Sequence, residues 1–328
     1  MQNKKLNLNF DFIQSKIQPF YKTLEGLRNK HLFIFGGTGF MGLWIISLIK
    51  FLNQQYDFNI RVTALSRGFS NRDFIDYFYN SSNLKLVKGD VRNYSELPKD
   101  VSYILILASN PNLRFTASFP FDSLTTIGEG VSNILKMSEK LEKIEKICFL
   151  SSGLVGKDFS DGYVIAKRYA ESLCISARQE NRLPTFIIRP YTFIGPFQNI
   201  TSSWAHTMFM SDFINNNPIR ILSDGTAKRG YLYGYDAAYW ILYYLLNASP
   251  GEILSLGSDE EISIKDFARK LYESKNSNNQ IIFSDKPHSS SNIDFIPSLE
   301  KEKNKYNFKI FTKLAESLKL SIDWYKND

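Results

Sequence analysis

The sequence predicts an α/β protein with a doubly wound parallel sheet and a smaller C-terminal lobe. Two observations predict this fold class. Short apolar runs alternate with stretches of helical periodicity from residue 31 to residue 190, which is the pattern of a sheet built from strand–helix–strand units. The first apolar run also leads directly into the glycine-rich segment Ile34–Gly42, which predicts a strand, a tight turn and the start of a helix.

The predicted elements follow one another in a regular order. Six strands are expected, at residues 32–35, 60–65, 84–87, 103–108, 146–150 and 185–188. Helices are expected at 40–52, 124–141 and 163–178, and again at 236–246 after an irregular stretch. The fourth strand is continuous and apolar, as expected for a parallel strand covered on both faces. A ligand should therefore bind outside the carboxyl ends of the strands, where the glycine turn lies.

The two ends of the chain do not follow this alternation. Residues 1–30 carry apolar side chains at helical spacing, which predicts an extra helix packed on the domain or, as the alternative, a contact with a second subunit. Residues 276–292 are rich in Asn and Ser and are predicted to form a mobile loop. We therefore expect an N-terminal helical extension (1–30), a cofactor-binding domain (31–190 with 228–262) and a substrate-binding lobe (191–227 with 263–328).

Composition excludes several classes of function. The 328 residues are 43% hydrophobic and carry a net charge of +7, but the basic residues are spread along the chain and form no nucleic-acid-binding motif. The two cysteines lie in apolar runs and the three histidines have no metal-ligand spacing. The longest apolar stretch, Leu43–Leu52, is too short to span a bilayer. We expect a cytoplasmic protein without a metal, a membrane anchor or a nucleic-acid partner.

The glycine-rich segment is the first candidate site. Glycine permits a tight turn and lets the backbone contact a pyrophosphate, while the following helix offers its N-terminal N–H groups to the anion. The residues expected to bind the cofactor here are Gly36, Gly37, Thr38, Gly39, Phe40, Met41 and Gly42. A three-glycine match alone is weak evidence, so the interpretation depends on a second motif downstream.

The second motif consists of Tyr163 and Lys167, which follow Ser152 at the end of the predicted fifth strand. A spacing of four places the tyrosine and the lysine on one face of a helix. A nearby ammonium should lower the tyrosine pKa from about 10, so that the phenol can exchange a proton with a sugar hydroxyl or carbonyl oxygen. Lys167 can also hold the nicotinamide ribose, and Ser152 can hydrogen-bond the same substrate oxygen. Together with the glycine turn, these residues predict a hydride-transfer site.

These motifs resemble those of the extended short-chain dehydrogenase/reductases, in the group of nucleotide-sugar epimerases, dehydratases and reductases. The resemblance covers about residues 31–260 and implies a Rossmann domain that binds NAD or NADP. It adds cofactor contacts after the third, fourth and sixth strands. The residues implied are Asp90 (to adenine), Val91, Leu107, Ala108, Ser109 and Pro190, beside Tyr163 and Lys167.

The same resemblance implies a nucleotide-diphosphate sugar as the substrate. Ser152 and Thr192 would contact the sugar, although Thr192 stands where the family has an asparagine. Arg229 would clamp the diphosphate, a task that suits a guanidinium because it binds such anions in a bidentate manner. A homodimer is expected as well.

The chain departs from the family after Ser152. Dehydratases and decarboxylases carry an acidic residue there, whereas this chain has Gly153, Leu154 and Val155, so elimination of water or loss of CO₂ lacks its usual acid/base group. Only ten residues separate Ser152 from Tyr163, which resembles the 4-keto-reductases that make dideoxyhexoses such as abequose.

The end of the second strand bears on the choice of cofactor. Members that prefer NAD place an acid there to bind the ribose 2′-hydroxyl, whereas Ser66 and Arg67 in this chain suit a 2′-phosphate. We therefore expect the NADPH-dependent reduction of a nucleotide-linked 4-keto-6-deoxyhexose, with Tyr163 as the proton donor. The alternatives are a nucleotide-sugar 4-epimerase with tightly bound NAD and, from another class, a non-catalytic cofactor-binding regulator.

Overall fold

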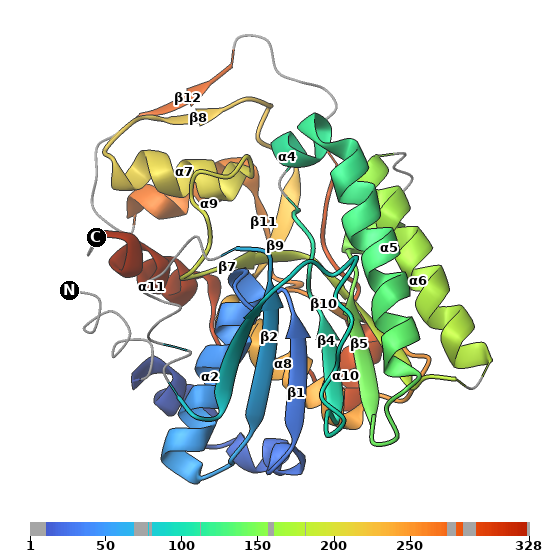
Figure 1. Cartoon of the computed structure of the whole chain (residues 1–328). Coiled ribbons are helices and arrows are strands. Elements are labelled where there is room, and N and C mark those ends of the chain that lie inside the picture. The colour runs from blue at the N-terminus through green and yellow to red at the C-terminus, as the bar shows by residue number, and fades with distance from the viewer. Residues whose placement is uncertain are drawn as a thin grey trace.

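Seven parallel strands form the central sheet of the protein (Figure 1). The structure is a computed structural model that describes residues 11–68, 78, 81–111, 113–156, 161–180, 182–273, 280–284 and 293–326. The strands are β1 (His31–Phe35), β2 (Arg61–Ser66), β3 (Leu84–Lys88), β4 (Tyr103–Ile106), β5 (Lys146–Leu150), β6 (Thr185–Pro190) and β10 (Ile253–Leu256). Their order is β3-β2-β1-β4-β5-β6-β10, and every neighbouring pair is parallel. The predicted doubly wound sheet is confirmed, and its order reverses between β1 and β4, where sheets of this kind bind ligands.

Helices cover both faces of this sheet (Figure 1). One face carries α5 (Pro120–Ser138) and α6 (Gly162–Gln179), and the other carries α2 (Phe40–Tyr56) and α8 (Gly234–Asn247). Alternate side chains of β1 enter the two cores because successive residues of a strand point to opposite faces. Leu32 and Ile34 join the core that contains α2 and α8, while Phe33 and Phe35 join the core that contains α5 and α6.

Parts of the chain beyond β6 build a smaller layer over the carboxyl ends of the sheet strands, while β10, α8 and α10 (Glu300–Tyr306) belong with the large sheet (Figure 1). Its three-stranded sheet has the order β11-β9-β7, and a separate pair is β12-β8. The strands are β7 (Thr192–Ile194), β8 (Ile219–Ile221), β9 (Lys228–Tyr233), β11 (Glu261–Ser263) and β12 (Ile281–Phe283). The helices of this part of the chain, besides α8 and α10, are α7 (Ala205–Ile214), α9 (Ile264–Glu273) and α11 (Leu314–Lys326). Within the described ranges, no helix is long and apolar enough to cross a membrane.

The N-terminal segment packs on its own domain, as predicted. Residues 11–17 are helical, and a 3-10 helix, η1, spans Tyr21–Leu27. Ile13, Ile17 and Leu24 are fully buried in the core that contains α2 and α8. The apolar stripe of this extension is therefore covered by the chain itself.

One prediction about the C-terminal part is wrong. The composition of residues 276–292 predicts a loop, but Ile281–Phe283 is a strand that pairs in parallel with Ile219–Ile221. Its β-branched and aromatic residues favour an extended chain. This run is only three residues long, and the many Asn and Ser residues around it lead to the prediction of a loop. Residues 276–279 and 285–292 lie outside the described part of the chain.

Candidate active site

The glycine turn packs directly against the end of β4. Gly36 has φ +95°, and a Cβ atom at this position would lie 2.9 Å from the backbone nitrogen of Ala108. A Cβ atom on Gly42 would lie 2.6 Å from the carbonyl oxygen of Gly36. Both positions therefore require glycine, one for its backbone conformation and both for the close approach of neighbouring backbone.

Gly39 differs from these two glycines because the space beside it is open. Among the described residues beyond its chain neighbours and its own helix, a Cβ atom on Gly39 would meet only the Gly36 carbonyl oxygen within 4 Å, at 3.4 Å. Gly39 is also the N-cap residue of α2, and no side chain of the described residues caps this helix terminus. An exposed helix N-terminus beside an open glycine fits a pyrophosphate, so the turn has the shape that a dinucleotide needs. Phe40 and Met41 begin the helix at this point.

The turn is tied to the end of β2. The hydroxyl groups of Thr38 and Ser66 are 2.6 Å apart and hydrogen-bonded, and the Ser66 hydroxyl also donates to the carbonyl oxygen of Gly68 at 2.9 Å. This contact places two of the predicted cofactor residues side by side at the carboxyl ends of β1 and β2.

Helix α6 begins where its sequence supplies a cap. The side chain of Asp161 accepts a hydrogen bond from the Tyr163 backbone nitrogen at 2.7 Å, and aspartate is among the preferred residues for this position. The Tyr163 side chain is buried, and its phenol is hydrogen-bonded by Ser109 and Ser152. Residues from the ends of β4 and β5 therefore meet the tyrosine, and the structure brings Ser152 and Tyr163 together.

The expected effect of Lys167 on the tyrosine is not what the structure shows. Burial raises the pKa of Tyr163 to about 12, and the hydrogen bonds from Ser109 and Ser152 oppose this rise only in part. The prediction that Lys167 lowers the pKa of Tyr163 below its usual value is therefore wrong for this structure. Desolvation disfavours a phenolate in an apolar site, and Tyr163 keeps its proton at neutral pH.

Lys167 is itself deeply buried, with 1% of its surface exposed. Its ammonium donates to the carbonyl oxygen of Leu150 at 2.6 Å and lies 4.8 Å from the ring centre of Phe149 and 5.7 Å from that of Tyr163. Burial lowers the pKa of Lys167 to about 7, while the charge of Glu171 opposes this shift. The lysine therefore titrates near neutral pH.

Glu171 continues the face of α6 on which Tyr163 and Lys167 lie, since it is four residues beyond the lysine. Its carboxylate is buried and accepts two hydrogen bonds from Arg189, at 2.9 Å and 2.6 Å. Arg189 precedes Pro190 at the end of β6. This bidentate ion pair links α6 to the strand end that leads into the substrate-binding lobe.

Two of the three residues predicted to bind substrate, Thr192 and Arg229, lie on the small sheet. Thr192 of β7 pairs with Tyr231 of β9, and Arg229 is two residues from Tyr231, so Thr192 and Arg229 are on the same face. One guanidinium nitrogen of Arg229 donates to the carbonyl oxygens of Lys228 at 2.8 Å and Ile293 at 2.6 Å. Arg229 therefore anchors the segment that starts at residue 293.

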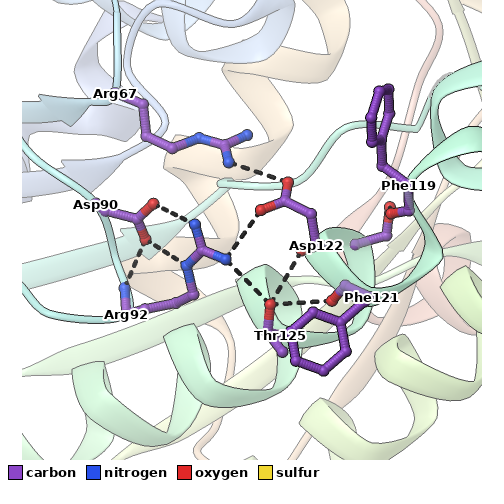
Figure 2. Close-up of polar contacts among 8 residues, drawn as sticks. Arg67, Asp90, Arg92, Phe119, Phe121, Asp122 and Thr125 are labelled. Carbon is purple, nitrogen blue, oxygen red and sulfur yellow. Dashed lines mark hydrogen bonds and ion pairs between the residues drawn. The ribbon is translucent and has the colours of Figure 1, made fainter.

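The residues after β2 and β3 meet in a charged cluster (Figure 2). The family resemblance predicts that Asp90 contacts adenine, and in this structure its carboxylate accepts hydrogen bonds from Arg92. Arg67 and Arg92 both donate to Asp122 of α5. Val91 is buried and packs against Gly130 of the same helix.

Four participants in these contacts are not assigned to the site by the sequence motifs. They are Arg92, Asp122, Glu171 and Arg189. Glu171 could have been found, because its spacing from Lys167 repeats that of Lys167 from Tyr163. Arg92 and Asp122 are 30 residues apart, and no local pattern joins them.

A comparison with protein-family models identifies the family to which the chain belongs. Residues 32–257 match the model of the NAD dependent epimerase/dehydratase family. The chain belongs to this family. Its relatives include the mouse dTDP-D-glucose 4,6-dehydratase, 22% identical over 328 residues that cover 91% of this chain and 89% of that protein. They also include UDP-glucuronic acid decarboxylase 1 of Xenopus tropicalis, 21% identical over 100% of this chain and 79% of that protein.

Solved structures agree on the fold. The Bordetella bronchiseptica enzyme WbmF in complex with NADH superimposes with a TM-score of 0.80 at 17% identity, covering 92% of this chain and 94% of that one. The UDP-glucuronic acid 4-epimerase of Bacillus cereus, in complex with UDP-glucuronic acid and NAD, gives 0.79 at 19% identity over 90% and 99% of the two chains. The chain is thus an enzyme of nucleotide-sugar metabolism that uses an NAD-type cofactor.

Proposed function

We propose that the protein reduces the keto group of a nucleotide-linked 4-keto-6-deoxyhexose with a nicotinamide cofactor. The observation that carries this proposal is the geometry at Tyr163, whose buried phenol is hydrogen-bonded by Ser109 and Ser152, beside a segment after Ser152 that holds no carboxylate. Tyr163 holds its proton at neutral pH, as an acid that protonates a carbonyl oxygen must.

The residues have separate parts in this mechanism. A nicotinamide cofactor, when bound, would supply the hydride. The glycine turn and the N-terminus of α2 would hold its pyrophosphate, and Lys167 would hold the nicotinamide ribose. Ser152 orients the carbonyl oxygen of the sugar, and Tyr163 donates its proton to that oxygen, which becomes a hydroxyl.

The segment after Ser152 argues against dehydration and decarboxylation. The three residues that follow carry no carboxylate, and a Cβ atom on Gly153 would lie 2.8 Å from the ring of Tyr191. An acidic side chain at position 153 would therefore displace Tyr191. This chain departs here from the dehydratase and decarboxylase among its relatives, so hydride transfer without elimination is the chemistry we assign to it.

A 4-epimerase is the second candidate. It would use the same Ser152, Tyr163 and Lys167 and return the hydride to the sugar. Asp122 favours this candidate because it already engages Arg67, the residue expected to bind the phosphate of NADP. Mass spectrometry of the cofactor that co-purifies with the protein distinguishes the two: stoichiometric, tightly held NAD points to the epimerase.

The test of the reductase is Tyr163→Phe, assayed with a panel of nucleotide-linked 4-keto sugars. Loss of the phenol oxygen should lower kcat by about 100-fold or more, the usual contribution of a positioned acid, while cofactor affinity stays unchanged. Tyr243→Phe is the matched control, since it removes a phenol oxygen from a partly exposed position of α8, outside the site and the proposed dimer surface. Wild-type rates in Tyr163→Phe would contradict the mechanism. Wild-type protein that binds cofactor but is inert with 4-keto and 4-hydroxy sugars would support the regulator.

We also propose a homodimer formed through α5 and α6. Their outward surface carries exposed apolar side chains, and Leu124 and Tyr169 lie over Gly162 and Gly128 of the facing helix. Phe121 is 77% exposed, and a patch of this kind marks an interaction surface. Tyr169→Glu should convert the dimer to monomers in light scattering, whereas a wild-type monomer would refute the assignment.

A further inference from the structure

Two guanidinium groups converge on one carboxylate at the adenosine end of the expected cofactor site. Arg67 follows β2, Arg92 follows β3, and Asp122 lies in the first turn of α5 (Figure 2). One oxygen of Asp122 accepts from Arg67 at 3.2 Å, and the other accepts from Arg92 at 2.9 Å. The carboxylate of Asp122 therefore links the ends of β2 and β3, near which we expect the adenosine of a dinucleotide to bind.

The remaining contacts of Arg92 make it the better held of the two arginines. Its Nε and Nη2 atoms donate to the two oxygens of Asp90, at 2.9 Å and 2.7 Å, and Nη1 also donates to the hydroxyl of Thr125 at 3.1 Å. Arg92 holds the pKa of Asp90 below its usual range, so Asp90 is charged at neutral pH. Arg67 has a single contact of this kind within the described residues, and its side chain is 45% exposed.

The charges in the cluster balance. Two guanidinium groups face two carboxylates, Asp90 and Asp122, which leaves no net positive charge for an incoming anion. A phosphomonoester carries close to two negative charges at neutral pH, because its second pKa is about 6. To reach Arg67 and Arg92, a 2′-phosphate must take the place of Asp122 or bind beside a like charge. A ribose 2′-hydroxyl meets no such penalty, since it can donate to the carboxylate.

We propose that Asp122 is a cofactor-discriminating residue, whose carboxylate competes with the 2′-phosphate of NADP(H) for Arg67 and Arg92 and thereby shifts the preference toward NAD(H). It supplies from α5 the acid that NAD-preferring members carry at the end of β2, where this chain has Ser66 and Arg67. This inference rests on the cofactor-binding part of the proposed function and is independent of which sugar is reduced.

The size of the effect follows from charge and exposure. Asp122 has a side-chain exposure of 31%, so its interactions are screened by water. A single negative charge about 6 Å from a dianion in water weakens the binding of that dianion by roughly 10-fold. We therefore expect the removal of this charge to raise affinity for a 2′-phosphorylated ligand by about 5- to 10-fold.

The test measures ligand binding and needs no turnover. Adenosine 2′,5′-bisphosphate and AMP, which differ in the 2′-phosphate alone, are titrated into wild type, Asp122→Asn and Glu129→Gln by calorimetry. Asp122→Asn should bind the bisphosphate about 5- to 10-fold more tightly and AMP within about two-fold of wild type. Glu129→Gln removes the same charge from an exposed position two turns along α5 and should leave the affinity ratio unchanged.

Two results would overturn the proposal. An unchanged ratio of the two affinities in Asp122→Asn, with an unfolding temperature near wild type, removes the competition, and an equal change for both ligands is such a result. Arg67→Gln provides the second variant: if it leaves bisphosphate affinity unaltered, the 2′-phosphate does not reach this cluster. Raised salt should shrink the effect of Asp122→Asn, because the interaction is electrostatic. These titrations contain no sugar substrate, so they test the choice of cofactor alone. The proposed reaction is tested separately by the activity of Tyr163→Phe.

Discussion

Lys167→Met should change how the stability of the protein depends on pH. Lys167 is the most deeply buried charged group of the catalytic helix, at 1% exposure, and burial lowers its pKa from 10.5 to about 7. The groups that face it are Glu171 and Cys174 on its own helix, whose charges raise its pKa, and the Leu150 carbonyl oxygen of β5, to which it donates.

The direction of the effect follows from proton binding. Between about pH 7 and 10.5 the unfolded chain holds a proton on this lysine that the folded chain has released. The free energy of unfolding therefore rises with pH across this window, by up to about 1.4 kcal/mol per pH unit from this group alone. Below about pH 7 both states are protonated, and the contribution is lost.

Urea unfolding of wild type and Lys167→Met at several pH values between about 7 and 9 tests this reasoning. Methionine keeps an unbranched side chain and removes the ionisation, so the difference between the two proteins cancels the other titrating groups. Between about pH 7 and pH 9, the free energy of unfolding of wild type should rise by about 2 kcal/mol or more relative to that of the variant. Two curves that stay parallel would mean that Lys167 is charged throughout, and that the burial argument is wrong.

Three further outcomes are expected. Gly42→Ala places a Cβ atom 2.6 Å from backbone and should lower the free energy of unfolding by about 1–3 kcal/mol. Gly39→Ala should leave the unfolding temperature unchanged and weaken cofactor binding in a titration. Equal effects of the two variants on stability would contradict the geometry. Arg229→Ala should raise the KM for a nucleotide-linked sugar more than it lowers kcat, and an unaltered KM would place the diphosphate elsewhere. Glu171→Gln breaks the ion pair with Arg189 and should lower the free energy of unfolding by about 1.5–3 kcal/mol. An unchanged free energy of unfolding in chemical denaturation would refute this prediction.

The sheet could be predicted from the sequence because its central strands β1, β4 and β5 are almost continuous apolar runs, whereas β3 at the edge carries two lysines. Burial on both faces requires such runs, and the observed ends differ from the predicted ones by no more than two residues. The strand at Ile253–Leu256 is not predicted as a separate element, although it closes the edge of the sheet beside β6. It is four residues long, and Ser255 interrupts its apolar residues, so the pattern is too short to separate from a loop.

The candidate site was predictable only in part. Glycines 36 and 42 are constrained by neighbouring backbone, and the spacing of Tyr163 and Lys167 follows from helix geometry, so both signals are local. The protonation of Tyr163 is a different kind of property. It depends on how completely the α5–α6 side of the sheet excludes water, and sequence reasoning that considers only the charge of Lys167 reaches the opposite sign.

The two ends of the cofactor site determine different properties of the enzyme, the chemical step at one end and the choice of cofactor at the other. At the nicotinamide end, a buried and protonated Tyr163 suits the donation of a proton to a carbonyl oxygen. At the adenosine end, Asp122 accepts hydrogen bonds from Arg67, on which the expectation of NADP depends, and from Arg92. Hydride transfer takes place at the nicotinamide, so the charge beside the adenosine ribose selects the cofactor and does not alter the chemical step. A preference for NADH would therefore leave the reductase mechanism intact. A 4-epimerase also protonates a carbonyl oxygen from Tyr163 when it returns the hydride, so the retention of NAD, and not the protonation of Tyr163, separates the two reactions.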